Sequence, residues 1–148
     1  AAASKSPFQP PRVYNYHMSK EEAVSYWVNS ANDDWEVAQN LFASKKYNHA
    51  LFFLQLTLEK LIKAVHISRH DDHPLYVHNL VLLSQKAGLE LDSNTQEELK
   101  EISSFNVSAR YDSYKRDFYH KATAKFASEW IRKGQVIRNK LLQELESS

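Results

Sequence analysis

Apolar residues recur every three or four positions along most of this chain, and that spacing constrains the fold more than any other feature. It predicts helices over residues 20–42, 47–67 and 75–87, a fourth that opens near residue 93, and a fifth that opens near residue 123. Only two glycines and four prolines could interrupt them, and three of those prolines lie within the first eleven residues. The sequence therefore predicts an all-α fold, an antiparallel up-and-down bundle of about five helices.

The start of the chain differs in composition from the rest. Residues 1–17 are rich in small and polar side chains and in proline, which disfavours helix. Met18 is the only methionine, and Ser19 directly after it is a favourable helix cap. We therefore expect one helical domain over residues 18–148, a size that suits a single domain. The preceding segment is a leader, a linker from a longer protein, or a remnant of cloning.

Composition excludes several kinds of site. The formal net charge is +1, from 19 basic and 18 acidic residues, so an anion-binding site must come from a local cluster of charges. The absence of cysteine excludes disulfides, thiolate catalysis and cysteine-ligated zinc, and it fits a reducing, cytoplasmic location. No apolar run approaches the ~20 residues that span a membrane. Two glycines are too few for a glycine-rich phosphate loop, and no cofactor is predicted.

Short motifs follow one another in order along the chain. They are Trp27-x7-Trp35-x2-Ala38-x2-Leu41, Tyr47-x2-Ala50, Glu59-Lys60-x2-Lys63-Ala64, His78-x-Leu80 and Phe105-Asn106-x3-Arg110-Tyr111-Asp112. Together they resemble the HEPN family of small helical proteins, over about residues 20–140. The resemblance implies a HEPN-like helical bundle, a symmetric homodimer, and binding of a nucleotide or RNA. It also implies a role of toxin–antitoxin type beside a small nucleotidyltransferase partner.

Nuclease members of that family share an arginine and a histidine separated by four to six residues. The arginine holds a phosphate through charge-assisted bonds, and the histidine can take the proton of a ribose 2′-hydroxyl. Here Tyr111 follows Arg110, and the next histidine, His120, lies ten residues on. The standard motif is therefore absent from the matching helix. Two alternatives to nucleotide binding stay open: a metal-independent ribonuclease that uses Arg110 with His120 or His78, and a helical protein–protein interaction module.

A basic and aromatic segment surrounds Arg110. Its cations suit phosphates and its tyrosines suit base stacking, so the predicted nucleotide-binding residues are Arg110, Tyr111, Lys115, Arg116 and Tyr119. We expect Arg110 and Arg116 to bind phosphate, and Tyr111 and Tyr119 to stack or to hydrogen-bond. The alternative is a solvated loop in which Arg110 pairs with Asp112 or with a helix C-terminus.

Two further groups of polar residues have simpler explanations. The first resembles a metal cluster: His66, His70, His73 and His78 with Asp71 and Asp72. Because Pro74 ends the helix there, we predict a histidine-rich surface loop and no metal site. The second is the pair Glu59 and Lys63, one helical turn apart, which would contribute only ~0.3–0.5 kcal/mol if exposed. His78 either packs as a core histidine or approaches Arg110 across the bundle.

Overall fold

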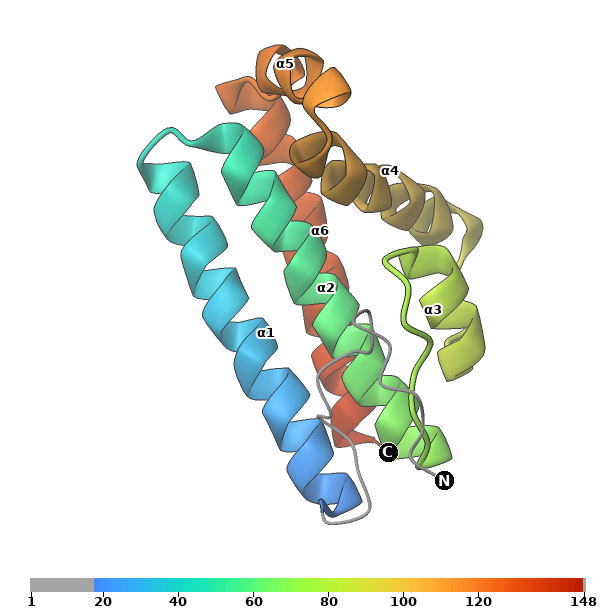
Figure 1. The fold of residues 1–148 in the computed structure, drawn as a ribbon. Coiled ribbons are helices and arrows are strands. Elements are labelled where there is room, and N and C mark those ends of the chain that lie inside the picture. Colours follow the sequence, from blue (N-terminus) through green and yellow to red (C-terminus); the bar gives the residue numbers. More distant parts are fainter. Residues whose placement is uncertain (1–17, 148) are drawn as a thin grey trace, which may run out of the picture.

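The computed structural model describes residues 18–147, and all regular structure within them is helical (Figure 1). The helices follow one another as α1 (Lys20–Ala43), α2 (Tyr47–His70), α3 (Leu80–Ala87), α4 (Ser93–Arg110), α5 (Asp112–Lys121) and α6 (Ala124–Glu146). The predicted all-α class is confirmed. The predicted leader, residues 1–17, lies outside the described part of the chain.

Side-chain caps explain where the long helices begin. The Ser19 hydroxyl accepts a hydrogen bond of 3.0 Å from the backbone N–H of Glu22, and the Glu22 carboxylate accepts one from the Ser19 N–H, which forms a capping box. Asp92 caps α4 by accepting from the N–H of Thr95 at 2.7 Å. Thr123 caps α6 in the same way. These three starts agree with the positions predicted from the sequence.

The structure differs from the predicted helices in two places. The helix predicted from residue 75 begins only at Leu80, because the Asn79 side chain caps it there; the preceding stretch 71–79 is a loop. A further short helix, α5, occupies the segment that showed no clean apolar spacing. Its only buried residue is Phe118, so no repeating pattern could reveal it.

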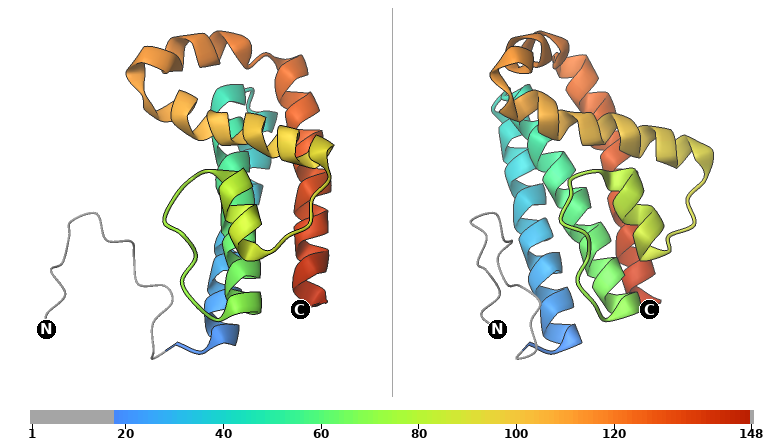
Figure 2. Two further views of the ribbon diagram at one scale, coloured as in Figure 1. Left: turned by 90° about the vertical axis from the view of Figure 1, so that its right-hand side faces the viewer. Right: turned by 45° about the vertical axis from the view of Figure 1, so that its right-hand side comes forward.

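Helix α2 lies at the centre of the bundle and contacts α1, α3, α4 and α6. It is antiparallel to α1 but runs in the same direction as α6 (Figure 1). Two contacts mark this parallel packing: Gly134 lies against Leu54 towards one end, and Arg69 pairs with Glu144 towards the other. The alternation of an up-and-down bundle therefore holds for the first pair of helices. It changes at α6 because α4 and α5 return the chain to the end of the bundle where α2 begins (Figure 2).

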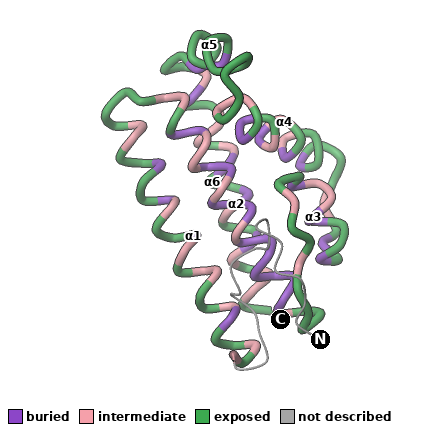
Figure 3. Tube along the Cα trace, in the orientation of Figure 1, coloured by how far each residue is buried: buried purple, intermediate pink, exposed green. Residues whose placement is uncertain are grey.

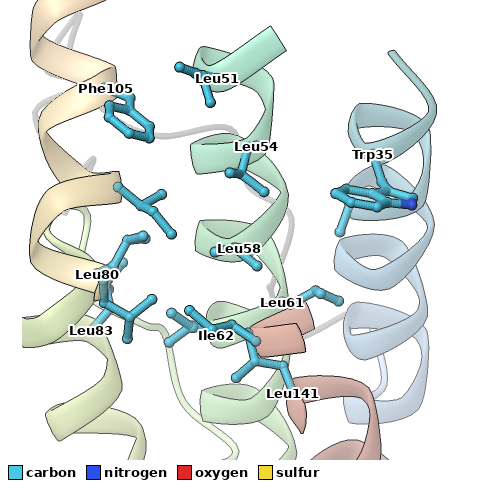
Figure 4. Close-up of a cluster of buried hydrophobic side chains, with 14 of the residues drawn as sticks. Trp35, Leu51, Leu54, Leu58, Leu61, Ile62, Leu80, Leu83, Phe105 and Leu141 are labelled. Carbon is cyan, nitrogen blue, oxygen red and sulfur yellow. The ribbon is translucent and has the colours of Figure 1, made fainter. Parts of the chain in front are cut away.

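The core surrounds α2, which is buried along most of its length (Figure 3). Leucines of α2 meet side chains from every neighbouring helix, and Figure 4 labels ten of the core residues: Trp35, Leu51, Leu54, Leu58, Leu61, Ile62, Leu80, Leu83, Phe105 and Leu141. Each fully buried leucine or isoleucine contributes about 1.5–3 kcal/mol relative to an exposed one. This central position explains why α2 is apolar on more than one side.

An aromatic cluster fixes α4 and α5 to the end of the bundle. The ring of Phe105 on α4 stacks on Phe118 of α5, with 5.6 Å between centroids. It also meets Phe126 and Trp130 of α6 edge-on, at 6.0 and 5.9 Å. Such aromatic pairs contribute about 0.5–1.5 kcal/mol each beyond the area that they bury. The cluster therefore determines where the junction of α4 and α5 lies.

Candidate functional site

All predicted site residues except His78 lie at the α4–α5 corner, residues 110–121, which extends past the side of the bundle (Figure 2). Arg110 is the last residue of α4, and Tyr111 alone separates the two helices. The backbone of Tyr111 is extended, with φ −98° and ψ 126°. Its N–H donates to the carbonyl of Val107 at 3.2 Å, and its own carbonyl accepts from Tyr114 and Lys115 at 2.9 and 3.1 Å. These bonds define the turn, so the predicted solvated loop is instead a helix–helix corner.

All five predicted nucleotide-binding residues are exposed on this corner: Arg110, Tyr111, Lys115, Arg116 and Tyr119. Tyr111 and Tyr119 expose 52% and 64% of their surface, which is high for aromatic side chains. The guanidinium of Arg110 lies 5.5 Å from the centroid of the Tyr111 ring, within range of a cation–π contact. The corner thus combines cations with aromatic faces at the surface of the protein.

The charges of the corner are only partly neutralised. Asp112 pairs with Lys115 at 3.2 Å, and both side chains are exposed, so this pair contributes little. The predicted alternative pairing of Asp112 with Arg110 does not form. Among residues 18–147, neither Arg110 nor Arg116 forms an ion pair. Their guanidinium groups therefore remain available for an anion.

The two predicted catalytic histidines lie in different surroundings. His120 is exposed on α5, where its ring meets that of Tyr119 at 5.5 Å. His78 lies in the loop before α3, and its Nδ1 is 2.8 Å from a carboxylate oxygen of Glu59. Within the described residues, no hydrogen bond, ion pair or ring contact joins either histidine to Arg110. The predicted approach of His78 to Arg110 is not seen as a direct contact.

A buried polar network on α2 was not expected from the sequence. Glu59 and Lys63 are only 5% and 3% exposed, and their charged groups are 2.9 Å apart. The side-chain amide of Gln55 donates hydrogen bonds to the Glu59 carboxylate at 3.0 Å and to the backbone carbonyl of His78 at 3.2 Å. Its own carbonyl oxygen accepts from the side-chain amide of Asn106 at 3.0 Å. The network therefore joins α2 to α4 and to the loop that carries His78.

The protonation of Glu59 follows from its surroundings. Burial alone would raise the pKa of this carboxyl, but the Lys63 ammonium and hydrogen bonds from Gln55, Lys63 and His78 outweigh burial and lower the pKa from its ordinary value of 4.5. Glu59 is thus a carboxylate, which only accepts hydrogen bonds. His78 must then donate from Nδ1, and in the neutral imidazole its Nε2 is an acceptor.

Hydrogen-bond direction is fixed along the rest of the network as well. Because Gln55 donates its NH₂ to Glu59, its oxygen faces Asn106, one helical turn before Arg110 on α4. The loop that carries His78 is therefore joined through α2 to Asn106 of α4, four residues before the corner. A sequence signal did exist: Gln55 interrupts the apolar stripe of α2, and such a polar residue needs partners inside the protein.

The other histidines make local contacts. His66 Nε2 lies 2.6 Å from Asp72, and His70 Nε2 lies 3.2 Å from the carbonyl of Ala87. Among residues 18–147, no group of three or more histidine or acidic side chains is arranged to hold a metal ion. None of the described helices is long and apolar enough to cross a membrane.

Comparison with known proteins gives a fold relative and a family. The crystal structure of TT1696 from Thermus thermophilus superposes with a TM-score of 0.70 at 19% sequence identity, covering 82% of this chain and 97% of that one. No protein of curated function matches the sequence. The family model of the HEPN domain matches residues 24–145, most of the chain, including α4 and α5. The chain therefore belongs to the HEPN family.

Proposed function

We propose that this protein binds a nucleotide or RNA at the α4–α5 corner. Arg110 and Arg116 bind phosphate, Lys115 adds a further cation, and Tyr111 and Tyr119 stack on bases or hydrogen-bond to them. Membership of the HEPN family supports nucleotide or RNA binding in general. One observation carries the proposal for this site: the exposed Arg110 guanidinium lies over Tyr111 and forms no ion pair among residues 18–147.

The chemistry of these side chains supports the proposal. A guanidinium presents a planar fork of donors that matches two phosphate oxygens, and this bidentate geometry distinguishes it from a lysine. Stacking of a base on an aromatic side chain contributes about 1–3 kcal/mol and tolerates any base. The corner therefore offers phosphate binding and stacking side by side, without a pocket shaped for one particular base.

We also propose that the protein forms a homodimer and acts with a small nucleotidyltransferase in a system of toxin–antitoxin type. The Phe105–Asp112 motif resembles that of a bacterial subgroup of the HEPN family whose members are often encoded beside a small nucleotidyltransferase, and this likeness supports the assignment. A two-fold symmetric dimer would present the α4–α5 corner twice, which doubles the cationic surface available to one RNA.

A second candidate is RNA cleavage without a metal, by Arg110 with His120 or His78. The observation that favours it is the bond from His78 to the Glu59 carboxylate at 2.8 Å, which orients the imidazole; in its neutral form, Nε2 can accept a proton. Cleavage requires that a histidine and Arg110 reach the same phosphate in the bound state. Shortening of RNA in excess chelator, lost on Arg110→Ala, would support this candidate.

The direct test is a titration of the purified protein with ATP and with a short RNA at low and high salt. The wild type should bind with an affinity that falls as salt rises, and Arg110→Ala and Arg116→Ala should weaken binding. Arg132→Ala, which removes an exposed arginine of α6, is the matched control and should bind like the wild type. Absence of binding by the wild type at every salt concentration would refute the proposal.

A further inference from the structure

One face of α4 lines an open groove of about 320 Å³. Four residues of the helix form one wall: Lys100, Ser103, Ser104 and Val107. Positions three and four apart lie on the same side of a helix, so these residues form one stripe. His78 and Asn79, from the loop before α3, form the other wall.

The same stripe leads to the α4–α5 corner. Arg110 follows Val107 by three residues and is the last residue of α4, so the groove leads along the helix to Arg110, and Tyr111 comes directly after it. Ten residues separate Lys100 from Arg110, which corresponds to about 15 Å along the helix. Successive phosphates of one strand in a duplex are about 3.4 Å apart along the axis. The distance therefore matches about four stacked nucleotides and exceeds a single one.

The groove walls suit a polynucleotide backbone. Lys100 is exposed and gives the groove a cation at the end opposite Arg110. Val107, 43% exposed, supplies an apolar surface between the two cations. The Ser103 hydroxyl already accepts a bond of 2.9 Å from the N–H of Leu80, so its hydrogen remains able to donate to a phosphate oxygen. The arrangement places positive charge at both ends and uncharged contacts between them.

The two acidic residues of α4 nearest Lys100 do not cancel its charge. Glu101 is paired with Lys121 of α5 at 3.0 Å, which also ties α5 to the middle of α4. Glu97 lies one turn before Lys100, beyond the lining of the groove. An anionic strand would therefore end near Lys100 rather than continue towards the start of α4.

His78 gives the groove a means to recognise ribose. The bond from Nδ1 to the ionised Glu59 directs Nε2 away from that carboxylate, where the neutral imidazole offers an acceptor, and the His78 side chain is 43% exposed. A ribose 2′-hydroxyl can donate to such an acceptor, whereas deoxyribose has no hydroxyl at that position. Because Glu59 is held by Lys63 and Gln55, the imidazole is oriented before any ligand arrives.

We propose that the stripe from Arg110 through Val107 and Ser104 to Lys100, with His78 opposite, binds a single strand of RNA about four nucleotides long. This inference rests on the proposed function, since Arg110 and Tyr111 hold one end of the strand. It adds a second binding region, the groove, and it assigns the ligand class as an oligoribonucleotide. A mononucleotide would occupy the corner alone.

The test compares ligand lengths. The wild type is titrated by fluorescence anisotropy with ATP, with oligouridylates of two, four and eight nucleotides, and with an eight-nucleotide deoxyuridine strand. The affinity should rise up to about four nucleotides and then level off, and the DNA strand should bind more weakly than RNA of equal length. Equal affinity for the two strands would overturn the assignment of RNA.

Two variants separate the groove from the corner. Lys100→Ala should weaken binding of the RNA octamer about fivefold and should leave ATP binding unchanged. The slope of log affinity against log salt concentration for the octamer should become shallower by about one. Ser104→Glu places a negative charge in the groove and should weaken the octamer further, again without effect on ATP. Lys86→Ala, on the exposed end of α3, is the matched control.

Failure of the inference can be told apart from failure of the proposed function. ATP binding together with an RNA affinity that is independent of length, and unaffected by Lys100→Ala, would overturn the groove and leave the corner intact. Loss of both ATP and RNA binding in the wild type would overturn both. Circular dichroism of each variant confirms that altered binding reflects the groove and not the fold.

Discussion

The buried pair of Glu59 and Lys63 makes a strong prediction about stability. In Lys63→Met the unbranched stem is retained, so little volume is lost between the rings of Trp27 and Tyr76, which lie 5.4 and 5.6 Å from the ammonium. What disappears is the positive partner of a carboxylate that is only 5% exposed. Removing one member of a buried pair costs about 3–5 kcal/mol. We expect about 3 kcal/mol, because Gln55 and the loop histidine still donate to the carboxylate.

The effect should depend on pH in a defined direction. In the native protein the pKa of Glu59 is lowered below 4.5, so the carboxylate contributes stability above that pH and loses it as pH falls through the lowered pKa. In Lys63→Met the largest lowering influence is gone, so we expect burial, the largest influence on this carboxyl, to raise the pKa of Glu59. The variant should therefore gain stability on acidification from neutral pH to about pH 5, and the gap to the wild type should narrow.

Urea unfolding followed by circular dichroism measures both effects. Lys133→Met is the matched control, because Lys133 pairs with Glu129 at the same spacing and a similar 3.0 Å but on the surface, and it should cost less than about 1 kcal/mol. The double variant Glu59→Gln with Lys63→Met removes both charges and should recover most of the lost stability. This account of the network would be refuted if Lys63→Met lost less than about 1 kcal/mol of stability. It would also be refuted if the stability lost in the double variant equalled the sum of the losses in the two single variants.

Further predictions concern packing and capping. In Gly134→Ala the new Cβ would lie 2.8 Å from Cδ2 and 3.0 Å from Cγ of Leu54. The resulting overpacking should destabilise the protein by about 1–3 kcal/mol, which outweighs the gain of about 1 kcal/mol in helix propensity. A higher melting temperature of the variant would contradict the close approach of α6 to α2. Phe118→Ala removes the stacking partner of Phe105 and should cost about 3 kcal/mol in urea unfolding; an unchanged midpoint would contradict the anchoring of α5. Ser19→Ala removes the cap of α1 and should cost about 1 kcal/mol, whereas Ser19→Asp should retain most of it, and equal losses in both would argue against the cap.

The sequence predicted those helices that bury a repeating stripe. Helices α1, α2 and α6 repeat their apolar positions over more than five turns, and their caps at Ser19 and Thr123 could be located from residue type alone. Helix α5 could not be predicted, because a helix fixed by the single buried side chain of Phe118 has no period. The direction of α6 relative to α2 could not be predicted either, because it depends on how α4 crosses the bundle and not on any local pattern.

The site was predictable in composition but not in geometry. The cations and tyrosines around Arg110 stand close together in the sequence, so they were found as a cluster. The bond between His78 and Glu59 joins residues nineteen positions apart, and the bond from Asn106 to Gln55 spans fifty-one. Local spacing carries no information about such pairings. The spacing of Glu59 and Lys63 is the same as that of an exposed surface pair, and only the packing of α2 reveals that they are buried.

The attachment of α5 through Phe118, its only buried residue, affects how the sequence of this helix can diverge during evolution. Every residue of α5 except Phe118 is exposed, so substitutions on it leave the interior almost untouched. Surface changes of this kind usually alter stability by less than about 0.5 kcal/mol. Substitutions can therefore change the charged and aromatic residues of α5 while the core of the bundle stays the same. Relatives with the same fold can acquire different ligands through substitutions among the exposed residues of α5, while Phe118 and the rest of the core are kept.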